Sequence, residues 1–384
     1  PMTIVYLDHA ATTPLSPAVR AALQPHLDAE FGNPSSRHPL GVRAAEHVAR
    51  AREQLSRALL VPARRIVFTS GGTEACNLAV LGFARAARAH GRHVLIGASE
   101  HACVREAAAA LAREGFEVEH ARLAPNGDID LDDFALKLRA DTVLVAQMLA
   151  NNEVGTVYSV RRAAQLVRAR AKQAKLFVDC VQAFGKLDCA PHELGADAVA
   201  LSAHKLHGPK GVGALAFADE PRLTPLVYGG GQELGLRAGT ENVAGIVGFG
   251  CAVEIAERER EQVVERLHEL RARLCEFVAS LRGARVLDRG AAQLPSLVAV
   301  LIPSAPAEVL MHHLEQRGVY VGSGSACQAS KNALSPTLLA LGLNEHEARR
   351  VLRFSMAATT TRDEIEVAGA ALLEVARELQ AVHG

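Results

Sequence analysis

The chain has 384 residues, 49% of them hydrophobic, which is enough to fill the core of a large domain and of a smaller one. Lysine plus arginine and aspartate plus glutamate both total 42, so the balanced charge argues against nucleic-acid binding and against an anionic membrane surface. The longest apolar runs are of strand length, and the first residues lack the basic and apolar regions of a signal peptide. We therefore expect a cytoplasmic protein that makes no contact with a membrane.

Short β-rich runs alternate with helical stretches rich in alanine and arginine between residues 60 and 220. Several of the runs are apolar without a period of two, as expected of strands buried on both faces of a mainly parallel sheet. The alternation predicts an α/β domain whose sheet is flanked by helices. The predicted strands span residues 66–69, 93–98, 142–148, 175–179, 198–202 and 213–217.

A cluster of glycines between residues 229 and 239 interrupts this alternation. Apolar side chains then recur at helical spacing over residues 251–281, which predicts one long amphipathic helix. Strand-like runs follow at 297–302, 319–321 and 351–354, and Thr361 with Glu364 has the pattern of a capping box at the start of a last helix. We predict a large domain over residues 16–250 and a smaller α/β domain built from residues 1–15 and 251–384.

The segment from Ser70 to Glu74 follows the first predicted strand and opens a helix. A helix N-terminus with glycines and hydroxyl groups is suited to a phosphate group. A simple capping role for Ser70 or Thr73 explains the segment equally well. The later run 211–216 has the glycine spacing of a dinucleotide fingerprint but leads into a strand, so it gives no support for nucleotide binding.

Polar side chains follow several other predicted strands. Asp179 ends a buried strand, where its carboxylate needs a cationic partner such as a pyridinium nitrogen. Lys205 follows the next strand, where burial would favour the neutral amine that a Schiff base requires. His101 is placed to stack on a planar ring or to move protons, and Asn152 occupies a similar position. Each residue also has a structural interpretation: a cap for Asp179, an ordinary structural histidine for His101 and a turn for Asn152.

Zinc binding by His204 and His207 is an alternative for the segment around Lys205, but no acidic or cysteine residue has fitting local spacing. The seven cysteines are scattered and odd in number, which argues against a disulfide framework. Cys327 lies among small residues, a setting suited to a travelling nucleophile whose thiol needs a nearby base or cation. Arg353 interrupts an apolar run, and a substrate carboxylate would fit its guanidinium group.

Six motifs together resemble the cysteine desulfurases of the class V aminotransferase superfamily, which are pyridoxal-phosphate enzymes of fold type I. The motifs occur in order and cover essentially the whole chain. The resemblance implies a sulfurtransferase that converts L-cysteine to L-alanine and leaves a persulfide on Cys327. The motifs are residues 6–14 (YLDHAATTP), 31–36 (FGNPSS), 72–74 (GTE), 151–153 (NNE), 202–205 (SAHK) and 323–327 (SGSAC).

The resemblance also implies a role for each candidate residue. Lys205 would carry pyridoxal 5'-phosphate as a Schiff base and then move the substrate proton, Asp179 would pair with the ring nitrogen, and His101 would stack on the ring. Arg353, helped by Asn33 and Asn152, would bind the substrate carboxylate. The remaining cofactor contacts would come from Asn152, from Gln182 at the ring hydroxyl, from Gly72, Thr73, Ser202 and His204 at the phosphate, and from Thr240 at the phosphate of the neighbouring subunit in a homodimer.

The sulfur acceptor is expected to be a protein, such as an iron–sulfur scaffold, or a thiol. By family analogy Cys327 is a transient ligand of an iron–sulfur cluster, and no other metal is expected. The chain stops at Gly384 without the extension that housekeeping relatives use to dock the scaffold, so the acceptor stays open.

Four residues, Gly72, Cys76, Cys180 and Val181, differ from the residues most common in the family at these positions, which are Ala, Asp and a small residue followed by Thr. Selenocysteine lysis and transamination are alternatives, because Lys205, Asp179 and Arg353 serve them equally well. A catalytically silent scaffold protein is a third alternative. Cys327 is the feature that favours sulfur transfer.

Overall fold

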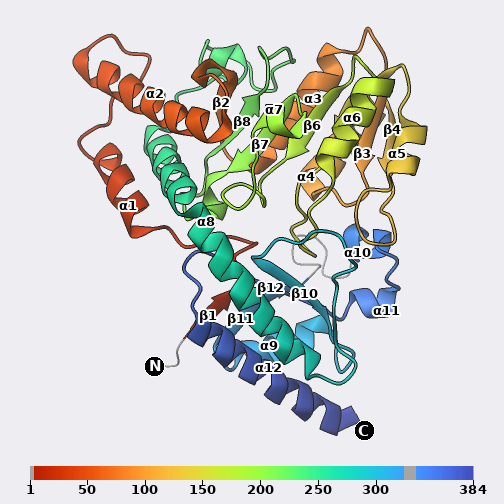
Figure 1. Ribbon diagram of the computed structural model, residues 1–384. Coiled ribbons are helices and arrows are strands. Elements are labelled where there is room, and N and C mark those ends of the chain that lie inside the picture. Colours follow the sequence, from red (N-terminus) through yellow and green to blue (C-terminus); the bar gives the residue numbers. More distant parts are fainter. Residues whose placement is uncertain (1–3, 324–333, 384) are drawn as a thin grey trace.

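The computed structural model describes residues 4–323 and 334–383, with side-chain surroundings given up to residue 379. Cys327 therefore lies outside the described residues. Two β-sheets lie one above the other in Figure 1, a seven-stranded sheet in the upper part and a five-stranded sheet in the lower part. No helix among the described residues is long and apolar enough to span a membrane.

The seven-stranded sheet is mainly parallel, as predicted. Only β8 runs antiparallel to its two neighbours, and the other four strand pairs are parallel. The six strands predicted from the sequence are all present, although the second and third end earlier than expected. In spatial order the strands are β2 (Ile66–Thr69), β8 (Gly213–Phe217), β7 (Ala198–Ser202), β6 (Lys175–Asp179), β5 (Thr142–Ala146), β3 (His93–Gly97) and β4 (Glu117–Ala121).

Helices cover both faces of this sheet. Alternate strand residues enter two separate cores: Leu176 and Val178 of β6 pack on one side, and Phe177 packs on the other. The first core also contains residues of α2 (Pro39–Leu59), α6 (Val160–Arg170) and α8 (Val243–Ala279), and the second contains residues of α3 (Gly72–Ala86) and α4 (Ala102–Arg113). This double burial explains the apolar strands without a period of two. Shorter helices are α1 (Pro17–Leu23), α5 (Leu131–Lys137) and α7 (Pro191–Leu194).

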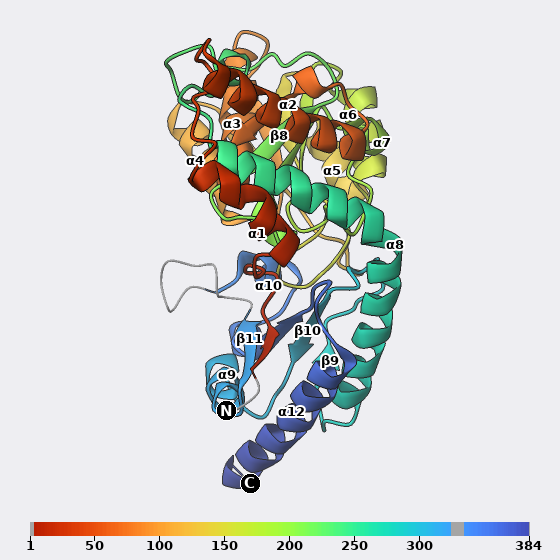
Figure 2. The ribbon, with the colours of Figure 1, turned by 90° about the vertical axis from the view of Figure 1, so that its left-hand side faces the viewer.

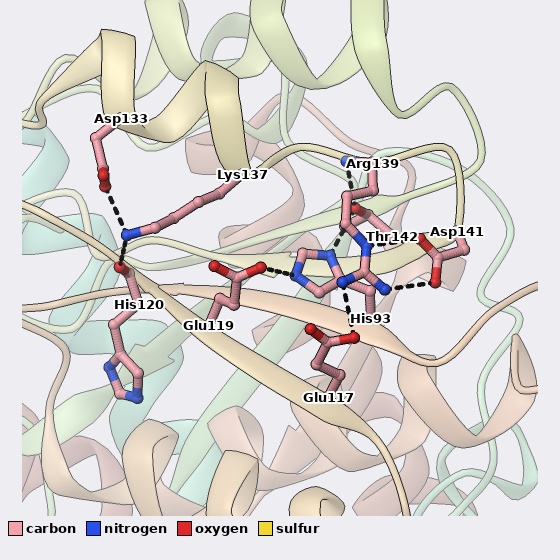
Figure 3. Close-up of polar contacts among 9 residues, drawn as sticks. All are labelled: His93, Glu117, Glu119, His120, Asp133, Lys137, Arg139, Asp141 and Thr142. Atoms are coloured by element: carbon pink, nitrogen blue, oxygen red, sulfur yellow. Dashed lines mark hydrogen bonds and ion pairs between the residues drawn. The ribbon is translucent and has the colours of Figure 1, made fainter.

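The edge strand β4 was not predicted, because its outward residues are polar. Figure 3 shows charged side chains at this edge, where Arg139 forms ion pairs with Glu117 at 2.7 Å and with Asp141 at 2.8 Å. Nearby, the buried His93 ring contacts the Thr142 hydroxyl at 2.8 Å. Charged side chains are a common protection against pairing of an edge strand with another chain. The alternating apolar pattern is correspondingly weak in β4.

The five-stranded sheet is mixed and includes the first strand of the chain. β1 (Val5–Leu7) pairs in parallel with β11 (Val319–Ser323), and the other pairs are antiparallel. The order continues through β12 (Val351–Ser355), β10 (Leu297–Leu301) and β9 (Arg285–Val286). The first strand and the C-terminal strands therefore share one sheet, and the division into two domains stays a prediction. The remaining helices are α9 (Ala307–Glu315), α10 (Pro336–Ala340), α11 (Glu345–Ala348) and α12 (Arg362–His383).

The predicted capping box of the last helix is present. The Thr361 amide donates to the Glu364 carboxylate at 2.7 Å, and the Glu364 amide donates to the Thr361 hydroxyl at 3.2 Å. These bonds satisfy two amides that the first turn of α12 leaves without helical partners.

The long helix α8 joins the two parts of the molecule, as Figure 2 shows. Its first half packs in a core of the large sheet through residues such as Phe249, and its second half packs against the small sheet through residues such as Leu274. The predicted start at Cys251 was wrong, because α8 already begins at Val243. The glycines before Cys251 are poor helix formers, so the sequence alone did not predict a helix there. Gly250 is needed there: a Cβ atom would lie 2.9 Å from the Ala51 Cα atom of α2.

Candidate active site

A cavity of about 540 Å³ lies at the carboxyl ends of β6 and β7, beside the N-terminal ends of α3 and α4. Such strand ends are where ligands bind in α/β sheets. The cavity also receives Ala10, Ala11 and Thr12 from the segment that follows β1. It is lined by nine of the residues predicted from the sequence, namely Gly72, Thr73, His101, Asn152, Asp179, Gln182, Ser202, His204 and Lys205.

One end of the cavity has the properties of a phosphate site. The first turn of α3 begins here at Gly72 without a side-chain cap, so the capping interpretation of Ser70 and Thr73 was wrong. The buried Ser202 hydroxyl has no hydrogen-bond partner among the described residues. Lys210 also lines this cavity and supplies positive charge. Free helix amides, an unpartnered hydroxyl and a lysine together fit a phosphate group.

His204 lies beside this end with its ring held in place. Its Nδ1 atom lies 3.1 Å from the Thr12 hydroxyl. Burial, reinforced by the charges of Lys205 and Lys210, lowers the pKa of His204 to about 4. The imidazole is therefore neutral at physiological pH when no ligand is bound.

Asp179 lies at the other end of the cavity, as the last residue of β6 and with only 6% of its surface exposed. Its Oδ1 atom accepts a hydrogen bond from the Val181 amide at 2.9 Å, and its Oδ2 atom accepts one from the Cys76 thiol at 3.7 Å. No lysine, arginine or histidine among the described residues forms an ion pair with it within 4.0 Å. Burial raises the pKa of this carboxyl. A cationic ring nitrogen would compensate its charge.

Lys205 ends a short 3-10 helix, Ala203–Lys205, directly after β7. Its amine donates hydrogen bonds to the carbonyl groups of Ala10 and Ala11, the latter at 2.8 Å. Gln182 also donates to the Ala10 carbonyl, at 2.9 Å. The segment after β1 thus holds two predicted cofactor ligands at the cavity wall.

His101 is the N-cap residue of α4. Its Nδ1 atom accepts a hydrogen bond from the Cys103 amide at 3.2 Å and lies 3.0 Å from the Cys103 sulfur. These contacts fix the orientation of the ring in the cavity wall. Asn152, which is buried, contributes its backbone carbonyl to a hydrogen bond from Arg353 at 2.9 Å.

Three predicted residues do not line the cavity. Arg353 on β12 is 1% exposed and forms an ion pair with Asp8 at 2.6 Å, so it reaches the cavity only through Asn152. Asn33 is exposed, and its side chain accepts a hydrogen bond from the Ser35 amide. Thr240 is also exposed.

Two cysteines in the cavity wall were not predicted as site residues. Contact with Cys76, with a contribution from His101, lowers the pKa of Cys103 to about 6. The same contact, together with burial, raises the pKa of Cys76 well above its usual value. The sequence did contain a signal that these cysteines lie near the site. Cys76 follows Gly72 by one helical turn, and Cys103 follows His101 by two residues.

The sequence matches the family described as Aminotransferase class-V over residues 5–367. It is 38% identical to the cysteine desulfurase IscS of Dictyoglomus turgidum, over 94% of this chain and 91% of the relative. The chain belongs to the cysteine desulfurases of the class V aminotransferase family. It is also 36% identical to the cysteine desulfurase IscS 1 of Archaeoglobus fulgidus, with 94% of each chain covered.

Solved structures of this family have the same fold. A NifS-like protein superposes with a TM-score of 0.91 at 32% identity, covering 97% of this chain and 99% of that one. The protein SspA in complex with cysteine superposes with a TM-score of 0.81 at 31% identity, covering 94% of this chain and all (100%) of that one. The predicted fold is thereby confirmed. The desulfurase depends on pyridoxal phosphate, as its family does.

Proposed function

We propose that this desulfurase takes sulfur from L-cysteine, releases L-alanine and holds the sulfur as a persulfide on Cys327. The observation that carries the proposal is the single cavity that joins Lys205, Asp179 and the unpartnered Ser202 hydroxyl in a chain of this family. The relative whose structure contains cysteine supports the choice of substrate.

The cavity residues would hold pyridoxal phosphate by complementary groups at its two ends. Ser202, His204 and the amides of Gly72 and Thr73 would bind the phosphate. Asp179 would pair with the ring nitrogen, while Gln182 would contact the ring hydroxyl and His101 would stack on the ring. When bound, the cofactor withdraws electrons from the substrate Cα atom.

Proton movement is proposed for Lys205, with His101 as a second proton carrier. The Lys205 amine lies beside the carbonyl groups of Ala10 and Ala11, which orient it in the wall of the cavity. From this position it would take the Cα proton of the substrate as a general base.

Sulfur transfer is proposed to occur by attack of the Cys327 thiolate on the substrate sulfur. A sulfur–sulfur bond forms and the carbon–sulfur bond breaks. The electron pair of the broken bond stays with the carbon, which takes up a proton to become the methyl group of alanine. The persulfide on Cys327 then passes its outer sulfur to an acceptor.

Substrate binding is proposed to involve Arg353. Its guanidinium is buried and already paired with Asp8, and it contacts the Asn152 carbonyl at the cavity wall. A substrate carboxylate would compete with Asp8 for this group, with Asn33 and Asn152 as further contacts. Bidentate binding to guanidinium is the geometry that a carboxylate prefers.

We further propose a homodimer in the cytoplasm. Thr240 is exposed and would reach the phosphate of the neighbouring subunit. Large apolar side chains are exposed in the same glycine-rich stretch, including Tyr228 at 76% and Leu234 at 53%. Contact with a second copy would cover them. The acceptor is proposed to be a protein of iron–sulfur cluster or thio-cofactor synthesis.

Replacement of Cys327 tests the proposed function. Cys327→Ala should keep the absorbance of the bound cofactor and lose alanine formation from cysteine by at least about 100-fold, because the nucleophile is absent. Cys275→Ala, at a half-buried thiol on α8, is the control and should keep activity. Labelled cysteine with mass spectrometry should place the persulfide on Cys327. Undiminished sulfide release by Cys327→Ala would refute the proposal, and keto-acid formation would indicate an aminotransferase.

A further inference from the structure

Two thiols and a carboxylate meet in the wall of the cofactor cavity. Cys76 comes from α3, Cys103 from the first turn of α4 and Asp179 from the end of β6. Their sulfur and oxygen ligand atoms all lie within 4.8 Å of one another. We propose that these three residues bind one thiophilic divalent cation, with Zn²⁺ as its representative, when the cofactor is absent.

The geometry is close to that of a zinc site. Zinc binds sulfur at about 2.3 Å and carboxylate oxygen at about 2.0–2.2 Å, so tetrahedral angles require about 3.6 Å between the two ligand atoms. The Cys76 sulfur lies 3.7 Å from the Asp179 Oδ2 atom. Cation binding therefore needs little movement of this pair.

The chemistry of the three ligands favours soft cations. Thiolates select zinc and similar metals over magnesium and calcium, which prefer sites made of oxygen atoms only. Binding requires both cysteines as thiolates and would release any thiol proton still present, so that two thiolates and one carboxylate would face a charge of +2. Asp179 has no ion-pair partner among the described residues, so a cation would also compensate the charge of this buried carboxylate.

The fourth coordination position faces the cavity. Cys76, Cys103 and Asp179 all line it, so the cation can enter from there and can bind a water molecule on that side. His101 is already engaged through its Nδ1 atom, which accepts a hydrogen bond from the Cys103 amide. Three protein ligands and one open position, filled by water or substrate, are the arrangement of catalytic zinc sites.

The proposed site overlaps the proposed cofactor site at one residue. Asp179 would be a cation ligand in one state and the partner of the ring nitrogen in the other. Cation and pyridoxal phosphate should therefore exclude each other. This consequence rests on the proposed function, whereas binding of the cation to the cofactor-free chain does not.

Cobalt binding to the full-length chain after cofactor removal tests the site. Co²⁺ reports thiolate ligands by its charge-transfer absorption, and Zn²⁺ should abolish this absorption at one equivalent per chain. Cys76→Ser and Cys103→Ser should each weaken binding by more than about 100-fold, which exceeds the loss of roughly 10–100-fold expected for an outer-shell contact. Cys275→Ser is the matched control, because its thiol lies on α8 away from the cavity. All samples are kept reduced to prevent disulfide formation.

Three further measurements decide the outcome. Cys76→Ala replaces the serine variant if the latter melts earlier than the parent chain. Unchanged cobalt absorption in the Cys76 and Cys103 variants, or its loss in Cys327→Ser, would overturn the site. Equal cobalt binding with and without bound pyridoxal phosphate would overturn the exclusion. Because cobalt absorption requires no turnover, an inactive desulfurase with this cobalt signal would count against the proposed function alone.

Discussion

The Asp179 end of the cofactor cavity and the Arg353 corner beside it solve the problem of a buried charge in opposite ways. Asp179 has only a thiol and an amide as hydrogen-bond donors and no ion pair with a described residue. Arg353 is paired with Asp8 at 2.6 Å, and this pair lies against Gly322, where a Cβ atom would be 2.6 Å from the Asp8 carboxylate. The charge of Asp179 therefore needs a ligand to compensate it. Arg353 is already paired with Asp8, and a substrate carboxylate would have to replace that partner.

Asp8→Asn removes the compensation of Arg353 and should have the largest effect on stability. Loss of one partner from a buried ion pair costs about 3–5 kcal/mol, and the partial exposure of Asp8 places the expected loss near 3 kcal/mol. Urea unfolding measures this change. A substrate carboxylate should restore more stability to the variant than to the parent chain.

Asp219→Asn is the control for that experiment. Asp219 is 79% exposed and lies 3.9 Å from Arg65, so its replacement should cost less than about 1 kcal/mol. Equal effects of the two replacements would contradict the importance of the Arg353–Asp8 pair.

Asp179→Asn should show the opposite sign in the cofactor-free chain. Burial raises the pKa of Asp179 in the folded state above its unfolded value of about 3.9, so its contribution to stability falls as the pH rises through the raised pKa. Asparagine cannot ionise, and the variant should be more stable than the parent at neutral pH. The difference should vanish below about pH 4.

Asp197→Asn provides the contrast. Burial raises the pKa of Asp197, but hydrogen bonds from Lys175 and the Leu176 amide and the charge of Arg168 outweigh it and lower the pKa. Its replacement should destabilise the chain at neutral pH, with the loss shrinking as the pH falls through the lowered pKa. Urea unfolding at several pH values distinguishes the effect of Asp197→Asn on stability from that of Asp179→Asn. Destabilisation of the cofactor-free chain by Asp179→Asn would contradict the comparison.

Gly72→Ala should have the smallest effect and tests the fit of the phosphate end. The added Cβ atom would lie 2.8 Å from the Val181 Cγ2 atom, so the variant should lose up to about 1 kcal/mol and some cofactor affinity. Val181→Ala should remove most of this loss in the double variant. Additive effects of the two replacements would argue against the contact.

This contact relates two of the departures noted in the sequence. Gly72 and Val181 lie close together, since a Cβ atom on Gly72 would be 2.8 Å from the Val181 Cγ2 atom. The sequence alone could not relate them, because they are brought together by the ends of β2 and β6 in a sheet whose strand order is not readable from local patterns.

Local chemistry made much of the fold and site predictable. Asp179 and Lys205 were found because polar residues that end apolar strands face the ligand side of such a sheet. The Asp8 partner of Arg353 was missed, because it comes from the opposite end of the chain. β4 was missed because it is an exposed edge strand with polar residues. The pairing of Cys76 with Cys103 depends on how α3 lies against α4, which neither helix specifies alone.

The continuity of α8 has a mechanical consequence. A helix of 37 residues is about 55 Å long at 1.5 Å per residue, and this one is anchored in a separate hydrophobic core at each end. Melting either anchor would expose apolar side chains of the same rod, so the loss of one core weakens the other. We expect a single calorimetric transition for the cofactor-free chain, and any opening between the two sheets would have to bend this rod.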